Sequence, residues 1–389
     1  MAYANTVLSQ FLKYFSRSDF DKLEKKHHNG AKLRSASRWD QFVFIIVGQL
    51  TGRSSLRDIV EAARSQARKF YHAGAKLLPR STFSRLNNQY SYELYEDMFN
   101  VLLKRCKPIS PKHKFRFKNP LYSMDATTID LCLSLFPWAK FRKKKGGIKL
   151  NVTLNHNGFI PEFVDVSNAK SHEIKLARLV KLPEYSIVTF DRGYICFDWL
   201  KLLDDENIYF VTRPKKSIQF KIVERRAVNK KSGITSDHIV ILSSKNSNKK
   251  YPSKMRRIGY KDPETKKQYY FLTNNFTLAA KTIADIYKDR WQIELFFKWI
   301  KQNLKIKKFI GRSRNAVLTQ IWISLCVYLV ILFSKFINSI RQSPTQILRL
   351  VCINCFERRD FMSIFDPPPS KDKEKLELEI CIQSEFDLA

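Results

Sequence analysis

Residues 287–301, YKDRWQIELFFKWIK, form the most informative segment of the chain. We expect them to lie in a long helix that runs from about residue 278 to residue 304. At about 100° per residue, four polar side chains fall within one arc of about 60°, beside an apolar arc: Tyr287, Arg290, Glu294 and Lys301. One stripe of this helix therefore presents a carboxylate, two cations and a phenol, while the neighbouring face packs on a core.

Two aspartates elsewhere in the chain are candidate partners of Glu294. Asp125 lies in the strand-like run 121–136, and Asp191 ends the short predicted strand 186–191. Because a buried carboxylate is costly unless it is paired or binds a metal, acids within strands indicate a site. Carboxylates from three separate elements that meet at one sheet edge supply the oxygen ligands that Mg²⁺ or Mn²⁺ prefers. Without such neighbours, Glu294 is a solvated charge or half of a structural ion pair.

The composition indicates a polyanionic partner. The 389 residues include 70 Lys and Arg against 36 Asp and Glu, a formal net charge of +34, and 44% of them are hydrophobic. That apolar fraction is enough for a core and excludes a wholly disordered basic tail. A positive charge of this size fits a protein that binds nucleic acid or an anionic membrane surface, and a merely soluble basic protein is the plainer alternative.

One segment tests the membrane alternative. Residues 316–334, AVLTQIWISLCVYLVILFS, contain no charge and are long enough to span a bilayer. A helix buried behind a sheet has the same pattern, and we favour it because the segment is the only one of its kind and contains Thr319, Gln320, Ser324 and Ser334. Seven irregularly spaced cysteines indicate a reducing cytosol, and the pair Cys352 and Cys355 lacks the further ligands of a zinc site.

Four changes of pattern divide the chain. Residues 1–118 are helical in pattern, residues 119–213 alternate strands and helices, and residues 214–275 are basic and strand-like. The α/β pattern resumes over 276–340, and residues 341–389 form a C-terminal extension. Alternating strands and helices predict an α/β domain with a mixed sheet, which the β-rich segment interrupts as an insertion.

Two sets of cations are candidates for contact with DNA. Six cations lie within ten residues after the first predicted strand, and three of them are our candidates for phosphate contacts: Lys143, Lys144 and Lys145. In the N-terminal region a helix over residues 81–106 displays Arg80 and Arg85 at its start, as the second helix of a helix-turn-helix does. The alternatives are a solvated loop for the first set and an ordinary helical bundle for the second.

The acids and their spacing resemble a known family. The order Asp125, Asp191, Glu294, with the glutamate inside the pattern Tyr-x2-Arg-x3-Glu-x6-Lys, is similar to that of the DDE transposases of bacterial insertion sequences. More narrowly, it resembles their cut-and-paste subgroup, which carries that Tyr-Arg-Glu-Lys signature. Three further stretches are similar to the family: MDATTIDLCLS from Met124, DRGY from Asp191 and FLTNN from Phe271.

The resemblance implies a fold, a cofactor and roles for the site residues. It implies a ribonuclease-H-like core with a β-rich insertion, behind an N-terminal all-α DNA-binding domain. Asp125, Asp191 and Glu294 are then catalytic ligands of two Mg²⁺ ions, with Mn²⁺ as a substitute. By the same resemblance, three signature residues contact the DNA end near the cleaved phosphate: Tyr287, Arg290 and Lys301.

Stacking on a displaced base is a further role that the resemblance implies. Trp291 is its candidate on the signature helix, with simple core packing as the alternative. A second aromatic is expected from the insertion, and four tyrosines qualify: Tyr251, Tyr260, Tyr269 and Tyr270.

The predicted function is therefore that of a transposase, an enzyme that cleaves DNA and transfers its strands. Its expected partners are the terminal inverted repeats of an insertion sequence, target DNA and a second copy of the chain in the DNA complex, with no membrane. We expect it in the bacterial cytoplasm, associated with the nucleoid. The alternative is a related DNA nuclease or a domesticated, inactive DNA-binding derivative. The intact acids argue against inactivity, because a pure binder gains nothing from carboxylates that face phosphates.

Overall fold

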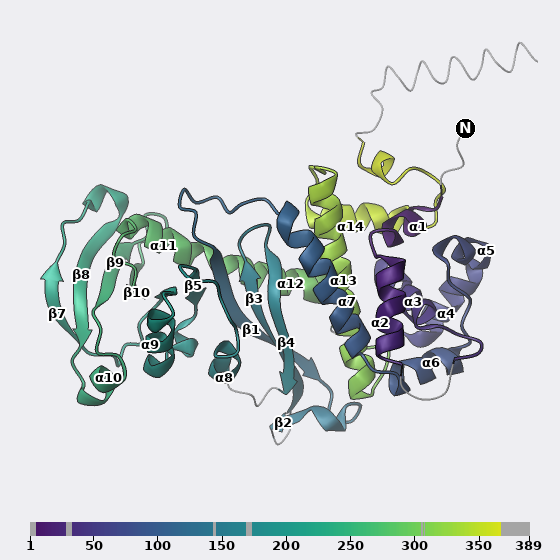
Figure 1. Ribbon diagram of the computed structural model, residues 1–389, viewed down its shortest axis with the longest axis horizontal. Coiled ribbons are helices and arrows are strands. Elements are labelled where there is room, and N and C mark those ends of the chain that lie inside the picture. The colour runs from purple at the N-terminus through teal and green to yellow at the C-terminus, as the bar shows by residue number, and fades with distance from the viewer. Residues whose placement is uncertain are drawn as a thin grey trace, which may run out of the picture.

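The computed structural model describes residues 5–28, 33–142, 145–168, 173–304, 306 and 308–366. Figure 1 shows an elongated molecule, with a sheet toward one end and the N-terminal helices at the other. The helices are α1 (Val7–Leu12), α2 (Arg17–Lys26), α3 (Arg38–Leu50), α4 (Leu56–Ser65), α5 (Ala67–Phe70), α6 (Arg80–Gln89), α7 (Glu93–Cys106), α8 (Glu173–Ala177), α9 (Phe197–Asp205), α10 (Lys245–Lys250), α11 (Ala280–Asp289), α12 (Trp291–Asn303), α13 (Arg314–Ile337) and α14 (Pro344–Ile353).

One sheet holds ten strands in the order β2-β3-β1-β5-β6-β10-β9-β8-β7, with β4 also paired to β3. The strands are β1 (Leu121–Leu131), β2 (Lys140–Arg142), β3 (Lys145–Asn155), β4 (Ile160–Asn168), β5 (Ile187–Phe190), β6 (Tyr209–Thr212), β7 (Phe220–Arg225), β8 (Ile234–Leu242), β9 (Met255–Lys261) and β10 (Gln268–Thr273). Strand β1 is antiparallel to β3 and parallel to β5, and β5 is parallel to β6. The predicted mixed α/β sheet is therefore confirmed.

The basic segment 214–275 forms β7 to β10, which pair with one another in antiparallel fashion. These strands continue the same sheet, because β10 pairs with β6. A buried ion pair joins β8 to β9, in which Arg256 donates to Asp237 at 2.7 and 2.8 Å. Arg256 also donates to the Leu278 carbonyl at 2.5 Å, and this bond ties the strands to the loop before α11.

Helix α13 is the core of the helical layer and packs against α3, α6 and α7. Among the described residues it is the one helix long and apolar enough to cross a membrane, and its most apolar stretch is buried throughout. Polar residues within it have partners: Ser324 accepts from Gln49 at 2.6 Å, and Gln320 donates to the Lys308 carbonyl at 3.0 Å. The prediction of a buried helix over 316–334 is confirmed.

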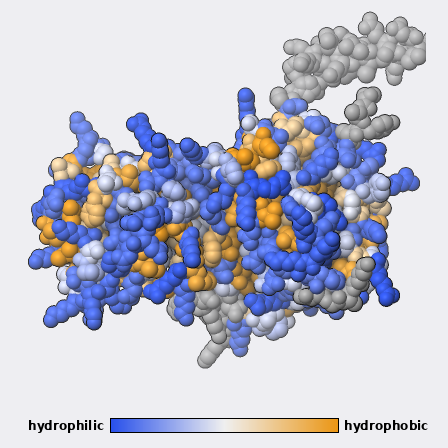
Figure 2. Space-filling model, in the orientation of Figure 1, coloured by the Kyte–Doolittle hydropathy of each residue, from blue (hydrophilic) through white to orange (hydrophobic). Residues whose placement is uncertain are grey.

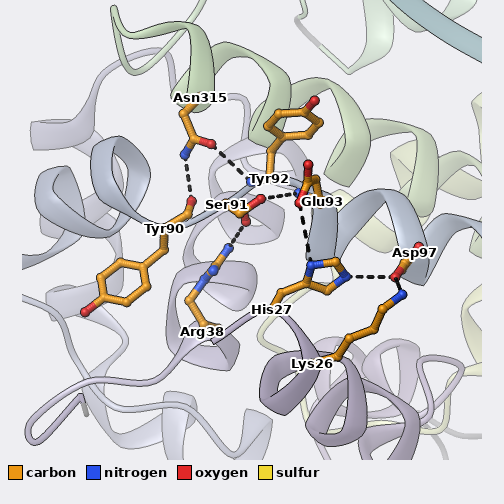
Figure 3. Close-up of polar contacts among 9 residues, drawn as sticks. All are labelled: Lys26, His27, Arg38, Tyr90, Ser91, Tyr92, Glu93, Asp97 and Asn315. Carbon is orange, nitrogen blue, oxygen red and sulfur yellow. Dashed lines mark hydrogen bonds and ion pairs between the residues drawn. The ribbon is translucent and has the colours of Figure 1, made fainter. Parts of the chain in front are cut away.

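The helix predicted over residues 81–106 is wrong in its extent, because the chain turns between α6 and α7. Figure 3 shows the cause: Asn315, at the start of α13, donates to the Tyr90 carbonyl at 2.7 Å and accepts from the Tyr92 amide at 3.1 Å. Arg38 of α3 donates a hydrogen bond to the Ser91 carbonyl at 2.7 Å. Peptide groups that would continue the helix thus have partners in other helices. The helix expected from residue 278 to 304 is likewise two helices, α11 and α12, which meet at Arg290.

Candidate active site

Two of the predicted acids lie at one end of a pair of neighbouring strands. Asp125 is in β1, and Asp191 directly follows β5. The two strands are parallel, and Met124 of β1 lies opposite Phe190, the last residue of β5. The residue that follows each of these two in the chain is an aspartate, so Asp125 and Asp191 lie at the same level. The carboxyl end of the β1–β5 pairing therefore carries both acids, at the kind of sheet edge where ligands bind in α/β folds.

Glu294 reaches this edge from α12, which packs against β1. The Arg290 guanidinium joins it to Asp125, because Nη1 donates to Asp125 Oδ2 at 3.2 Å and Nη2 donates to Glu294 Oε1 at 2.7 Å. Burial by itself lowers the pKa of Arg290, but the neighbouring Tyr287, Glu294 and Asp125 outweigh it and the net pKa is raised. The two carboxylates thus share one cation, whose side chain is only 11% exposed.

The donor chemistry here fits a divalent ion, since Asp125, Asp191 and Glu294 offer only carboxylate oxygens. A cation already lies between two of them in the form of Arg290. Among the described residues, however, no group of three His, Cys, Asp or Glu side chains is close enough to hold an ion. The arrangement is therefore a set of carboxylates balanced by Arg290 and not a closed ligand shell.

Tyr287, near the end of α11, lies against Arg290. The guanidinium carbon is 5.6 Å from the centre of the tyrosine ring, which packs on Phe271 of β10 with centroids 5.1 Å apart. Burial raises the pKa of Tyr287, so the phenol is a neutral hydrogen-bond donor near pH 7. A neutral hydroxyl beside a buried guanidinium is suited to contact an anionic oxygen.

The far end of α12 is fastened to β1 by Lys301. Its ammonium donates to Thr127 Oγ1 and, at 3.0 Å, to the Thr128 carbonyl. Arg290 and Lys301 thus hold the two ends of α12 to the same strand, which fixes where Glu294 lies relative to Asp125.

Trp291 is 57% exposed at the start of α12, so the alternative of simple core packing is wrong. It lines a cavity of about 440 Å³ together with Asp191, Tyr287 and Arg290. The other walls come from α11 and from the strands and loops after β6: Arg213, Tyr260, Asp262, Tyr269, Phe271, Ala284 and Lys288. The cavity therefore connects Asp191, one of the three predicted catalytic acids, with the β-rich segment.

Two of the four candidate tyrosines line this cavity, and the other two do not. Tyr260 and Tyr269 lie opposite each other on β9 and β10, and both line this cavity. Tyr251 is completely buried, and Tyr270 lies under the guanidinium of Arg257 at 4.1 Å, outside the cavity lining. Strand alternation was the available signal, because neighbours such as Tyr269 and Tyr270 point to opposite faces. Only the pairing of β10 with β9 shows which face of β10 meets the cavity.

A second hollow, of about 880 Å³, adjoins the first and shares Tyr260, Asp262 and Lys288 with it. Six lysines line it: Lys230, Lys231, Lys261, Lys266, Lys281 and Lys288. Its one carboxylate, Asp262, accepts from the backbone amides of Glu264 and Thr265 at 2.9 Å each. We call this hollow the lysine groove. Sequence reasoning missed it, because its lysines come from three separate segments.

Two of the remaining predicted DNA contacts, Arg80 and Arg85, lie apart from this site (Figure 1). Arg80 and Arg85 are exposed on α6, in the helical layer at the other end of the molecule in Figure 1, and Arg80 lines a hollow between the starts of α4 and α6. Lys145 is exposed at the start of β3. Lys143 and Lys144 lie outside the described residues. Hydrophilic side chains cover most of the face seen in Figure 2, with apolar residues in patches between them.

Comparison with known proteins gives a consistent result. A family model for the transposase DDE domain matches residues 116–330, and a model for a domain of unknown function, DUF4372, matches residues 3–76. The chain is 33% identical over 252 residues to the transposase y4zB of Sinorhizobium fredii. This alignment covers 63% of this chain and 69% of the relative. It is 26% identical over 290 residues to a transposase for insertion sequence element IS5377 of Geobacillus stearothermophilus, and the alignment covers 71% of this chain and 76% of the relative.

A likeness to a solved structure is weaker. The chain aligns with the piggyBac transposase synaptic complex with hairpin DNA at 11% identity and a TM-score of 0.46, over 96% of this chain and 84% of that one.

Proposed function

The chain belongs to the DDE transposase family of insertion-sequence elements, and we propose that it is a cut-and-paste member of the subgroup with the Tyr-Arg-Glu-Lys signature. As a transposase it cleaves DNA and transfers DNA strands. The narrower assignment rests on the spacing of Tyr287, Arg290, Glu294 and Lys301. It is supported by the contacts of Arg290 with Asp125 and of Lys301 with Thr127 and Thr128 of β1, and by the bond from Arg290 to Glu294.

The observation that carries the proposal is the Arg290 bridge between Asp125 and Glu294, beside the position of Asp191. We assign the three acids as the catalytic residues and as the ligands of two Mg²⁺ ions, for which Mn²⁺ can substitute. When bound, such ions activate the attacking hydroxyl or water and stabilise the leaving oxygen of a phosphodiester. Arg290 and Tyr287 then face the phosphate, where a guanidinium and a neutral hydroxyl donate to its oxygens.

We assign the fold around this site as a ribonuclease-H-like core, formed by residues 119–213 and 276–340. The strand order β4-β3-β1-β5-β6 supports this assignment, with the β1 pairings to β3 antiparallel and to β5 parallel. Residues 214–275 are then an insertion that extends the core sheet, and residues 341–389 a C-terminal extension. Residues 1–118 form a helical DNA-binding domain in this division.

Double-stranded DNA runs along the lysine groove to the mouth of the 440 Å³ cavity that Asp191 and Trp291 line, which we call the catalytic cavity and which has room for a displaced nucleotide. The groove adjoins the cavity and presents six ammonium groups, and the cavity offers Trp291, Tyr260 and Tyr269 as surfaces for base stacking. Cations elsewhere in the chain are further candidates for DNA contact: Arg80, Arg85, Lys143, Lys144 and Lys145. Two element ends have to be brought together, so we propose a homodimer in the DNA complex. The chain would act in the bacterial cytoplasm, at the nucleoid.

The proposed metal dependence is tested by a cleavage assay on DNA fragments that carry the ends of the element. We expect the purified chain to cut these fragments with Mg²⁺ or Mn²⁺ and to leave them uncut with EDTA, since carboxylates alone cannot stabilise the leaving oxygen. A fragment with a scrambled end serves as the control for specificity. Cleavage at the same rate in EDTA would show that the three acids are not metal ligands.

The lysine groove gives a separate prediction for DNA binding. We expect Lys230→Gln/Lys231→Gln to weaken binding of end DNA and to reduce the slope of log affinity against log salt by up to about 2, because each phosphate contact releases about one counterion. The matched control is Lys245→Gln/Lys249→Gln, which removes two exposed lysines of α10 that line neither cavity. An equal change in both double variants would mean that the effect is one of net charge and not of the groove.

A further inference from the structure

A buried hydrogen-bonded chain of side chains lies next to the catalytic residues. Ser123 Oγ is 2.6 Å from His156 Nε2, His156 Nδ1 is 2.9 Å from Asp289 Oδ2, and Lys114 donates to Asp289 Oδ1 at 2.5 Å. Ser123 is fully buried, and His156 and Asp289 are 2% and 6% exposed. The chain joins four segments: the loop before β1, β1 itself, the turn after β3 and the end of α11.

The charge state of this network follows from its surroundings. Burial lowers the pKa of His156, which outweighs the opposite effect of Asp289. Burial by itself raises the pKa of Asp289, but His156 and Lys114 outweigh it and the net pKa is lowered. A neutral imidazole beside a carboxylate donates a hydrogen bond from Nδ1, which leaves Nε2 to accept a hydrogen bond from the Ser123 hydroxyl. Every member then has a partner, and Lys114 balances the one negative charge.

The two ends of the network lie beside the residues that we assign to catalysis. Ser123 is two residues before Asp125 on β1, and side chains two apart on a strand point to the same face. Asp289 is the last residue of α11 and directly precedes Arg290, which binds Asp125 and Glu294. The network and the Arg290 bridge therefore connect the same two elements, β1 and the α11–α12 junction, at adjacent positions.

A packing role alone does not account for these residues. Replacing a buried ion pair by apolar side chains of similar volume is often neutral or stabilising, so such a network is weak evidence for stability. It does define geometry, because its hydrogen bonds hold only at set distances and angles, whereas apolar contacts tolerate sliding. The backbone strengthens the link, since the His156 amide donates to the Leu121 carbonyl of β1 at 2.9 Å.

We propose that Ser123, His156 and Asp289 form a positioning network, which sets where Arg290 and Glu294 lie relative to Asp125. This inference rests on the proposed catalytic site. None of the three residues touches DNA or the reacting atoms in this scheme. They act through the α11–α12 junction, in the way that outer partners orient the ligands of metal sites.

The test compares two variants of nearly equal shape. Ser123→Thr keeps a hydroxyl that donates to His156, and Ser123→Val adds the same bulk without it. We expect the single-turnover cleavage rate at saturating end DNA to be about 10- to 100-fold lower for Ser123→Val than for Ser123→Thr, as for other outer partners of metal ligands. The Kd for end DNA should agree within about twofold between them, because no DNA contact changes.

The control is a hydrogen bond of equal burial far from the site. Gln49→Leu removes the bond to Ser324 within the helical layer and should lower the melting temperature without lowering the cleavage rate of the folded protein. Equal rates for Ser123→Thr and Ser123→Val would overturn the proposal, and so would a rate loss in Gln49→Leu as large as that in Ser123→Val at the same fall in melting temperature. If the serine variants fail to fold, His156→Gln, which can still donate and accept, replaces Ser123→Thr, and His156→Leu replaces Ser123→Val. The Asp125→Asn variant separates the two levels: full activity there refutes the catalytic site itself, whereas its loss with no Ser123 effect refutes only the network.

Discussion

We expect the Asp125→Asn variant to bind end DNA as tightly as the parent protein and to cleave it at least about 10³-fold more slowly, a loss of several kcal/mol of transition-state stabilisation. The amide keeps the size of the carboxylate and removes the charge that a divalent ion requires. The same result is expected for Asp191→Asn and for Glu294→Gln, because all three acids are assigned to one centre. The measurement is single-turnover cleavage of labelled end fragments, with binding followed separately by gel shift.

The control for these variants is an exposed acid away from both cavities. Asp198 lies in the first turn of α9, pairs with Lys250 at 3.0 Å and lines neither cavity, so Asp198→Asn should cleave like the parent. The melting temperature should stay close to that of the parent in all four proteins. Asp125→Asn that cleaves as fast as the parent would refute the assignment of the centre. Loss of DNA binding together with cleavage would instead place Asp125 in substrate recognition.

Arg290→Gln is the second large effect that we expect, with cleavage slowed by about 10²- to 10³-fold, the range found when one donor to a developing negative charge is removed. The guanidinium is the shared cation of Asp125 and Glu294, and it lies on the wall of the catalytic cavity. Its loss leaves the two carboxylates unbalanced and removes a donor to the phosphate. Arg290→Lys keeps the charge but lacks the planar guanidinium that binds both acids, so we expect its cleavage rate to lie between those of the parent and of Arg290→Gln.

The control for Arg290 is on the same helix. Lys298 is exposed on α12 and lines neither cavity, so Lys298→Gln removes one positive charge from α12 without touching the site. It should cleave within about threefold of the parent, as surface substitutions away from a site usually have small effects. If Arg290→Gln is no slower than Lys298→Gln, the bridge seen in the structure has no part in cleavage.

Properties that depend on neighbouring residues could be predicted from the sequence. The shared face of Arg290, Glu294 and Lys301 along α12 follows from helical periodicity, and the buried helix over 316–334 follows from a long uncharged run. The mixed sheet followed from the alternation of strands and helices. Each of these is a local pattern, so one chain was enough to show it.

Contacts between distant segments could not be predicted in this way. The breaks at Tyr90 and at Arg290 interrupt patterns that read as continuous helix, and the first depends on Asn315, more than 200 positions away. The partners of His156, Ser123 and Asp289, lie on other elements, so the residues around His156 in the sequence give no sign of them.

The sequence by itself thus determined the family, and it predicted the three candidate acids and a polyanionic partner for the excess positive charge. Only the tertiary structure decided that Arg290 links two of those acids, that Tyr260 and Tyr269 line the catalytic cavity and that a lysine groove adjoins it. The physical reason is that spacing along a helix or strand is set by local backbone geometry. Which side chains meet across the molecule is set by strand register and helix packing, through hydrogen bonds between residues far apart in the chain.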